Sequence, residues 1–153
     1  MTEIDCIRKN RAGELPDRPY WEYVVLLGDD SLVRATQIVT TIALQSLAKW
    51  PSDAEWRDLL PNWFLNSFKR LSLEEAQELL RTTPREKWSE LPWDFGSWVD
   101  AIRERGWRWW SVEADLRKAT IRLSIQAWPA SLEAFEHILA ACDARIISRH
   151  DQV

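Results

Sequence analysis

Apolar residues recur along the chain with two different periods. Between residues 30 and 105 they lie mostly three or four positions apart, which is the spacing of one helical face. Two segments in this stretch, 52–55 and 72–75, have the Ser-x-x-Glu pattern of a helix-capping box. From Trp107 to Trp128 apolar residues recur at every second position, which is the spacing of one strand face. The pattern predicts a largely helical stretch over 30–105 and a β-hairpin over 107–128.

The predicted hairpin rests on agreement between its two strands. The even positions from Trp110 to Leu116 are apolar, and so are the odd positions from Ala119 to Ala127. A turn at residues 116–117 places apolar residues opposite apolar ones and polar residues opposite polar ones. The expected cross-strand pairs are Trp110 with Leu123, Val112 with Ile121, Ala114 with Ala119, Ser111 with Arg122, and Asp115 with Lys118. This register puts Trp107 and Trp109 on the polar face.

Three further segments complete the predicted elements. The run from Tyr20 to Leu27 is rich in aromatic and β-branched residues, which is typical of a strand. Residues 131–143 have apolar positions at helical spacing, and residues 144–148 form a short apolar run that predicts a strand. Residues 1–19 are polar and contain one glycine and two prolines, so we expect an irregular N-terminal arm. A single α+β domain over 20–150 should follow this arm.

The order of these elements is strand, helices, strand, strand, helix, strand. It resembles the β-α-β-β-α-β order of the ferredoxin-like fold, with a multi-helix insertion between the first two strands. The resemblance implies an α+β protein with an antiparallel sheet and helices packed on one face. The alternative is an α+β protein in which the hairpin and the helical part pack differently.

Tryptophan is the composition's main departure from average, with eleven among 153 residues. Six tryptophans occupy helices or the apolar strand face, and we expect them to pack in the core. These six are Trp50, Trp56, Trp63, Trp88, Trp98 and Trp110. Trp107 and Trp109 instead lie beside Ser111 and Glu113, so we expect them to anchor a partner, as tryptophans do at interface hot spots. The alternative is that the inserted helices cover and bury this face.

Charge and cysteine content narrow the choice of partner and compartment. Twenty basic and twenty-four acidic residues give a net charge of −4, which argues against nucleic acid and favours a basic protein partner. No apolar run approaches the roughly 20 residues needed to span a membrane, so no membrane partner is expected. Two cysteines cannot form a disulfide framework, and we expect a cytoplasmic protein.

The sequence contains none of the common catalytic or metal-binding motifs, and we predict no catalytic, cofactor-binding or metal-binding residues. Its two histidines are His137 and His150. His137 follows Glu133 by four residues on the last predicted helix, where we expect an ordinary surface pair. The absence of these motifs and the surface pair expected for His137 both favour a non-enzymatic protein.

We therefore expect a non-enzymatic cytoplasmic protein that binds another protein, and specifically a bacterial immunity protein that neutralises a basic toxin domain. The candidate partner-binding residues are Trp107, Trp109, Arg122, Glu113, Asp115, Trp93 and Asp94. One alternative is a small-molecule or carbohydrate-binding protein, or an enzyme, with an aromatic-walled pocket lined by Trp93 and Trp98. A third is a weak single-stranded nucleic-acid binder that stacks bases on an aromatic sheet face.

Overall fold

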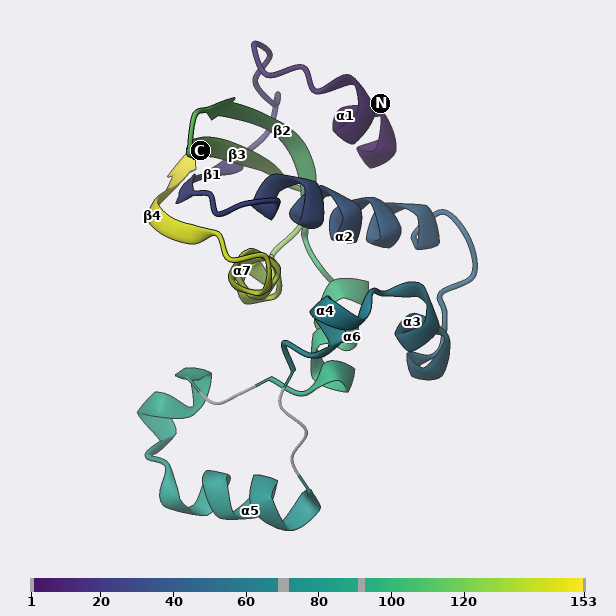
Figure 1. The fold of residues 1–153 in the computed structure, drawn as a ribbon, viewed down its shortest axis with the longest axis vertical. Helices are drawn as coiled ribbons and strands as arrows, with labels where there is room; N and C mark the ends of the chain where they lie inside the picture. The colour runs from purple at the N-terminus through teal and green to yellow at the C-terminus, as the bar shows by residue number, and fades with distance from the viewer. Residues whose placement is uncertain (1, 69–71, 91–92, 153) are drawn as a thin grey trace.

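A computed structural model describes residues 2–68, 72–90 and 93–152 as one four-stranded antiparallel sheet with helices packed against it (Figure 1). The strands are β1 (Tyr20–Leu26), β2 (Trp107–Asp115), β3 (Lys118–Ile125) and β4 (Arg145–Gln152). Their order across the sheet is β2-β3-β1-β4, and every neighbouring pair is antiparallel. The predicted α+β class and antiparallel sheet are confirmed.

Seven α-helices and one 3-10 helix lie in the described part of the chain. They are α1 (Glu3–Lys9), α2 (Ser31–Gln45), α3 (Asp53–Leu59), α4 (Asn62–Leu65), α5 (Leu73–Thr82), η1 (Arg85–Glu90, the 3-10 helix), α6 (Phe95–Arg103) and α7 (Leu132–Ala141). Both predicted capping boxes are present, at the starts of α3 and α5. None of the described helices combines the length and apolar character needed to cross a membrane.

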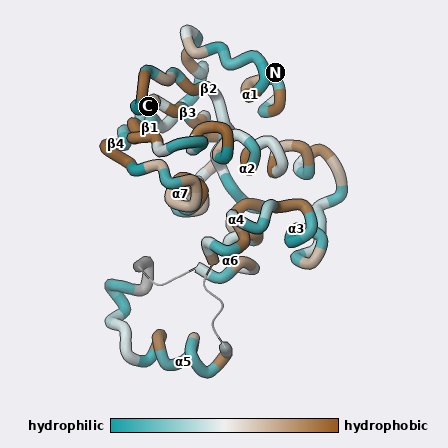
Figure 2. The backbone as a smooth tube through the Cα atoms, viewed as in Figure 1, coloured by the Kyte–Doolittle hydropathy of each residue, from teal (hydrophilic) through white to brown (hydrophobic). Residues whose placement is uncertain are grey.

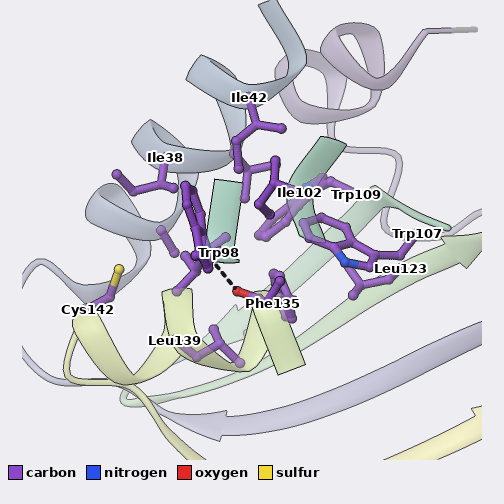
Figure 3. Close-up of a cluster of buried hydrophobic side chains, with 14 of the residues drawn as sticks. Ile38, Ile42, Trp98, Ile102, Trp107, Trp109, Leu123, Phe135, Leu139 and Cys142 are labelled. Atoms are coloured by element: carbon purple, nitrogen blue, oxygen red, sulfur yellow. Dashed lines mark hydrogen bonds between the residues drawn. The ribbon is translucent and has the colours of Figure 1, made fainter. Parts of the chain in front are cut away.

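The core lies between one face of the sheet and the helices α2, α6 and α7 (Figure 3). Trp98 of α6 is fully buried at its centre, between Ile38 of α2 and Phe135 of α7. Its indole Nε1–H donates to the main-chain oxygen of Ala134 at 3.2 Å, so the buried indole keeps a hydrogen bond. The helices therefore cover this face of the sheet with aromatic and branched side chains.

A β-bulge in β2 corrects the predicted placement of Trp107, Trp109 and Trp110. Four of the five predicted pairs are present, from Ser111 with Arg122 to Asp115 with Lys118, but the register shifts between Trp109 and Ser111. The extra residue is Trp110, so Trp109 lies opposite Leu123 instead. A bulge of one residue moves the preceding side chains to the other face. Trp107 and Trp109 consequently face the helices and are 0% and 2% exposed.

The N-terminal segment is also more ordered than expected. Residues 3–9 form α1, whose Ile4 and Cys6 side chains are buried. α1 packs beside β2 and α2 (Figure 1). Just after it, the Asn10 side chain pairs with the Val112 backbone, donating to its oxygen and accepting from its N–H, both at 2.9 Å. The first residues therefore cover the outer edge of β2, which a polar sequence with three helix-breaking residues did not predict.

Candidate functional site

Trp107 and Trp109 are anchors of the core. Their rings lie 5.2 and 6.2 Å from the Phe135 ring of α7. The Trp107 Nε1–H donates to the Ser131 main-chain oxygen at 3.2 Å. Side chains this deeply buried cannot form a binding platform in this conformation. Base stacking on this sheet face loses its support for the same reason.

Trp110, predicted to face the core, is half-buried on the other side of β2. Its Nε1–H donates to the main-chain oxygen of Glu14 at 2.7 Å, within the segment that follows α1. Of the other tryptophans expected in the core, Trp56 and Trp98 are fully buried, and Trp50 and Trp63 are half-buried. The side chain of Trp88 lies outside the described residues. These tryptophans therefore pack at several different elements and do not form one continuous surface.

Arg122 is the candidate residue with the most polar contacts. Its Nε donates to Glu22 at 2.8 Å, and its Nη1 donates to Glu113 at 3.0 Å and to the Ala12 main-chain oxygen. Burial lowers the pKa of Arg122, but the hydrogen bonds to Glu22 and Glu113 outweigh that effect and raise it. The structure thus brings Arg122 and Glu113 together, as an ion pair that ties β1, β2 and β3.

The remaining candidates have separate environments. Asp115 is exposed opposite Lys118, beside a shallow depression of about 240 Å3 at the hairpin end. Asp94 caps α6, accepting from the Ser97 N–H at 2.7 Å. Trp93 is half-buried near the His137 ring. Because Trp98 is fully buried, an accessible pocket walled by Trp93 and Trp98 is also without support.

His137 is packed between elements rather than paired with Glu133 on the surface. Its ring stacks on Phe68 at 4.3 Å, and its Nε2 lies 2.9 Å from the Ser67 hydroxyl oxygen. That hydroxyl donates to the Phe64 main-chain oxygen, so its single proton is used and the imidazole Nε2–H is the donor between them. Burial lowers the pKa of His137 to about 4. A serine–histidine pair arranged in this way does not activate the serine.

The cysteines and acidic groups form no metal site in the described part of the chain. Cys6 and Cys142 are both buried. Burial raises the pKa of Cys6, and it raises that of Cys142 to about 12. Thiols with raised pKa values are poor nucleophiles at neutral pH because little thiolate is present.

The exposed apolar side chains lie elsewhere, on residues that were not among the candidates. Leu73 and Leu80 of α5 are 75% and 47% exposed, and no side chain of α5 is buried. Hydrophobic and hydrophilic residues alternate along this helix, which lies away from the sheet (Figures 1 and 2). Trp128 is 63% exposed in the loop before α7. Helical spacing in the sequence identifies α5 as amphipathic, but it does not say whether the apolar face is covered.

A second accessible feature is a pocket of about 390 Å3 between α1, the end of α2 and the start of β2. Arg108 and Glu3 both line it, and Glu3 forms a buried ion pair with Arg105. The chain matches no protein-family model, no curated protein and no solved structure.

Proposed function

We propose that this protein works by binding another protein, with α5 at the centre of the contact surface. The observation that carries the proposal is the exposed apolar face of α5, where Leu73 is 75% and Leu80 47% exposed. Leu73 and Leu80 are seven residues apart and therefore lie on the same side of the helix, two turns apart. An amphipathic helix with such a face is a common recognition element, because the leucines can enter a groove on a partner.

The length of α5 supports this role. The helix has 10 residues, and isolated helices shorter than about 12–15 residues are only marginally stable in water. Its capping box contributes about 1 kcal/mol, and the Glu78–Arg81 pair contributes about 0.2–0.5 kcal/mol. Complete burial of each exposed leucine by a partner would contribute about 1.5–3 kcal/mol more. A bound partner would therefore supply the apolar contacts that α5 lacks.

The charges on α5 favour a basic partner. Glu74, Glu75 and Glu78 lie on this helix together with one basic residue, Arg81. Glu78 already pairs with Arg81 at 2.6 Å, so Glu74 and Glu75 supply the excess negative charge. Complementary charge around an apolar contact steers association and excludes partners of like charge. The net charge of −4 also favours a basic partner.

Within this class, the particular function we propose is that of a bacterial immunity protein acting in the cytoplasm. A toxin domain that attacks nucleic acid needs a basic surface to hold phosphates. The acidic helix and the exposed Asp115 would complement such a surface. This form of the proposal depends on α5 rather than on Trp107 and Trp109, which are core residues.

We also propose that the scaffold is of the ferredoxin-like type, with α2 through α6 occupying the first crossover. The sheet order β2-β3-β1-β4 supports this assignment, since β1 lies between β3 and β4 and all neighbours are antiparallel. In this arrangement α5 belongs to the inserted part, so a binding surface can be added without altering the sheet.

The test compares Leu73→Glu with Thr82→Glu, which adds the same charge at the end of the same helix. The probe is the purified product of the adjacent gene, and binding is measured by isothermal titration calorimetry. Wild type and Thr82→Glu should bind equally well, whereas Leu73→Glu should bind about 30-fold or more weakly, the loss typical of a hot-spot residue. Both variants should retain the wild-type Tm, because exposed positions rarely change stability by more than about 0.5 kcal/mol.

Two results would contradict the proposal. One is equal binding by Leu73→Glu and wild type, which would remove α5 from the contact. The other is a wild-type protein that stays monomeric and binds no adjacent gene product, which would remove the immunity function.

A further inference from the structure

The pocket beside Arg108 has a polar side, which includes Arg108, Glu3 and Gln126, and an apolar side. The apolar side is formed by Ile4, Ala43, Leu47 and Trp109, from α1, α2 and β2. Its volume of about 390 Å3 falls within the roughly 300–1,000 Å3 of small-molecule sites. Leu47 is 69% exposed, so the pocket opens to solvent at the end of α2.

The charges around this pocket are not balanced. Two guanidinium groups, Arg105 and Arg108, lie near one carboxylate, that of Glu3. Both oxygens of Glu3 already accept a hydrogen bond: one accepts from Arg105 at 2.5 Å, and the other accepts from the Trp109 N–H at 2.7 Å. Burial and the nearby Arg105 charge lower the pKa of Arg108, but an arginine stays protonated at neutral pH. Two guanidinium charges against one carboxylate leave a net positive charge on these three residues beside the pocket.

The hydrogen bonds of Arg108 leave a specific pair of donors free. Its Nη1 donates to the main-chain oxygens of Arg105 and Trp107, at 3.1 and 2.8 Å. Its Nε and Nη2 donate to no residue in the described part of the chain. These two atoms form the side of a guanidinium that holds both oxygens of a carboxylate. Arg81 holds the Glu78 carboxylate in this way, with Nε and Nη2 at 3.1 and 2.6 Å.

We propose that this pocket binds a small molecule with a carboxylate or phosphate group on an apolar body. Arg108 holds the oxyanion through Nε and Nη2, and the main-chain bonds of Nη1 fix the orientation of the guanidinium before binding. The apolar body packs against Leu47, at the open end of the pocket. This site is separate from α5, so it stands or falls independently of the proposed protein contact.

Three probes with the same phenyl ring test the site: benzoate, phenyl phosphate and benzyl alcohol. Binding is followed by the NMR signal of the Arg108 side-chain Nε–H. Benzoate or phenyl phosphate should shift this signal at millimolar concentrations, and the tighter of the two identifies the preferred oxyanion. Benzyl alcohol should leave the signal in place, because it carries the ring without the charge.

Variants of Arg108 provide the second part of the test, with binding measured by calorimetry. Arg108→Gln should weaken binding of the preferred anion about 10- to 100-fold, the usual loss for a charge-assisted pair of hydrogen bonds. Arg103→Gln, an exposed change on α6, is the matched control and should bind as wild type does. Binding that is equal in Arg108→Gln and wild type, a response to benzyl alcohol equal to that of the anions, or no response to either anion would each overturn the proposal.

Discussion

At the scale of single residues, Glu3 links three parts of the molecule. Its side chain is 7% exposed, and it joins α1 to Arg105 and to the outer N–H of β2 at Trp109. The Arg105 guanidinium in turn lies 5.0 Å from the centre of the Trp107 ring. One carboxylate therefore holds together a buried cation, an edge strand and the first helix.

Replacing Glu3 should be costly because it leaves the Arg105 charge buried without a counter-charge. We expect Glu3→Ala to lower the free energy of unfolding by about 3–5 kcal/mol, the usual cost of removing one member of a buried pair. Urea unfolding measures this change. The matched control is Glu14→Ala, which removes an exposed carboxylate paired with Arg11 and should cost less than about 1 kcal/mol. Equal losses in the two variants would refute the assigned role.

At the scale of elements, α4 and Phe68 are held on α7 by an aromatic cluster around one histidine. Phe64 and Phe68 contact the His137 ring at 5.9 and 4.3 Å, and both phenylalanines also contact Trp98. Burial disfavours the charged imidazolium and so lowers the pKa of His137, which keeps the packed ring neutral near neutral pH. This contact should therefore weaken in acid.

The pH dependence has a defined window and sign. The pKa of His137 is about 4 in the folded protein against 6.5 for an exposed histidine, so the unfolded chain binds one more proton between these values. Stability should be unaffected by this group above pH 6.5 and should fall as the pH decreases toward 4. The slope from one such proton is at most about 1.4 kcal/mol per pH unit. Thermal unfolding across this range measures it.

A phenylalanine variant separates the effect of His137 on stability from the effects of the other titrating groups. His137→Phe keeps a ring against Phe68 but cannot be protonated, so its Tm should depend less on pH between 6.5 and 4 than that of wild type. His150→Gln removes an exposed histidine and should retain the wild-type dependence. The assignment fails if His137→Phe and wild type lose stability in parallel.

At the scale of the whole molecule, the two edges of the sheet differ. The outer edge of β2 is covered at two points, because Glu3 accepts from the Trp109 N–H and Asn10 pairs with both backbone groups of Val112. β4 forms the opposite edge. Exposed strand edges promote pairing between chains, and natural proteins cover them. We therefore expect the N-terminal segment to hinder pairing of β2 with a strand of a second chain.

Removing residues 1–10 should uncover this edge. We expect the shortened chain to form dimers or larger species as its concentration rises, whereas the full chain should elute at one position. Size-exclusion chromatography with light scattering measures this, and circular dichroism checks that the strands persist. A shortened chain that stays folded and monomeric at all concentrations would show that the segment does not protect the edge.

The sequence predicted much of the fold correctly, but little of the accessible surface. The α+β class, two capping boxes and four cross-strand pairs followed from local patterns, since each depends on residues close in sequence or directly opposite in a hairpin. The bulge could also be recognised in the sequence, because the apolar positions change from odd to even numbers along β2. Trp107 and Trp109 alternate with Arg108 at odd positions, whereas Val112 and Ala114 are apolar at even ones. Two adjacent tryptophans, Trp109 and Trp110, concealed this change because either could face the core.

Spacing along the chain alone determined where strands and helices form and which side of each is apolar, because these properties repeat with the period of the backbone. The tertiary structure decided which of those apolar sides are covered. It buried Trp107 and Trp109 through one extra residue, left Leu73 and Leu80 exposed, and placed Arg108 beside a carboxylate already bound to Arg105. Burial and charge balance arise from contacts between elements distant in sequence, so no local pattern predicts them.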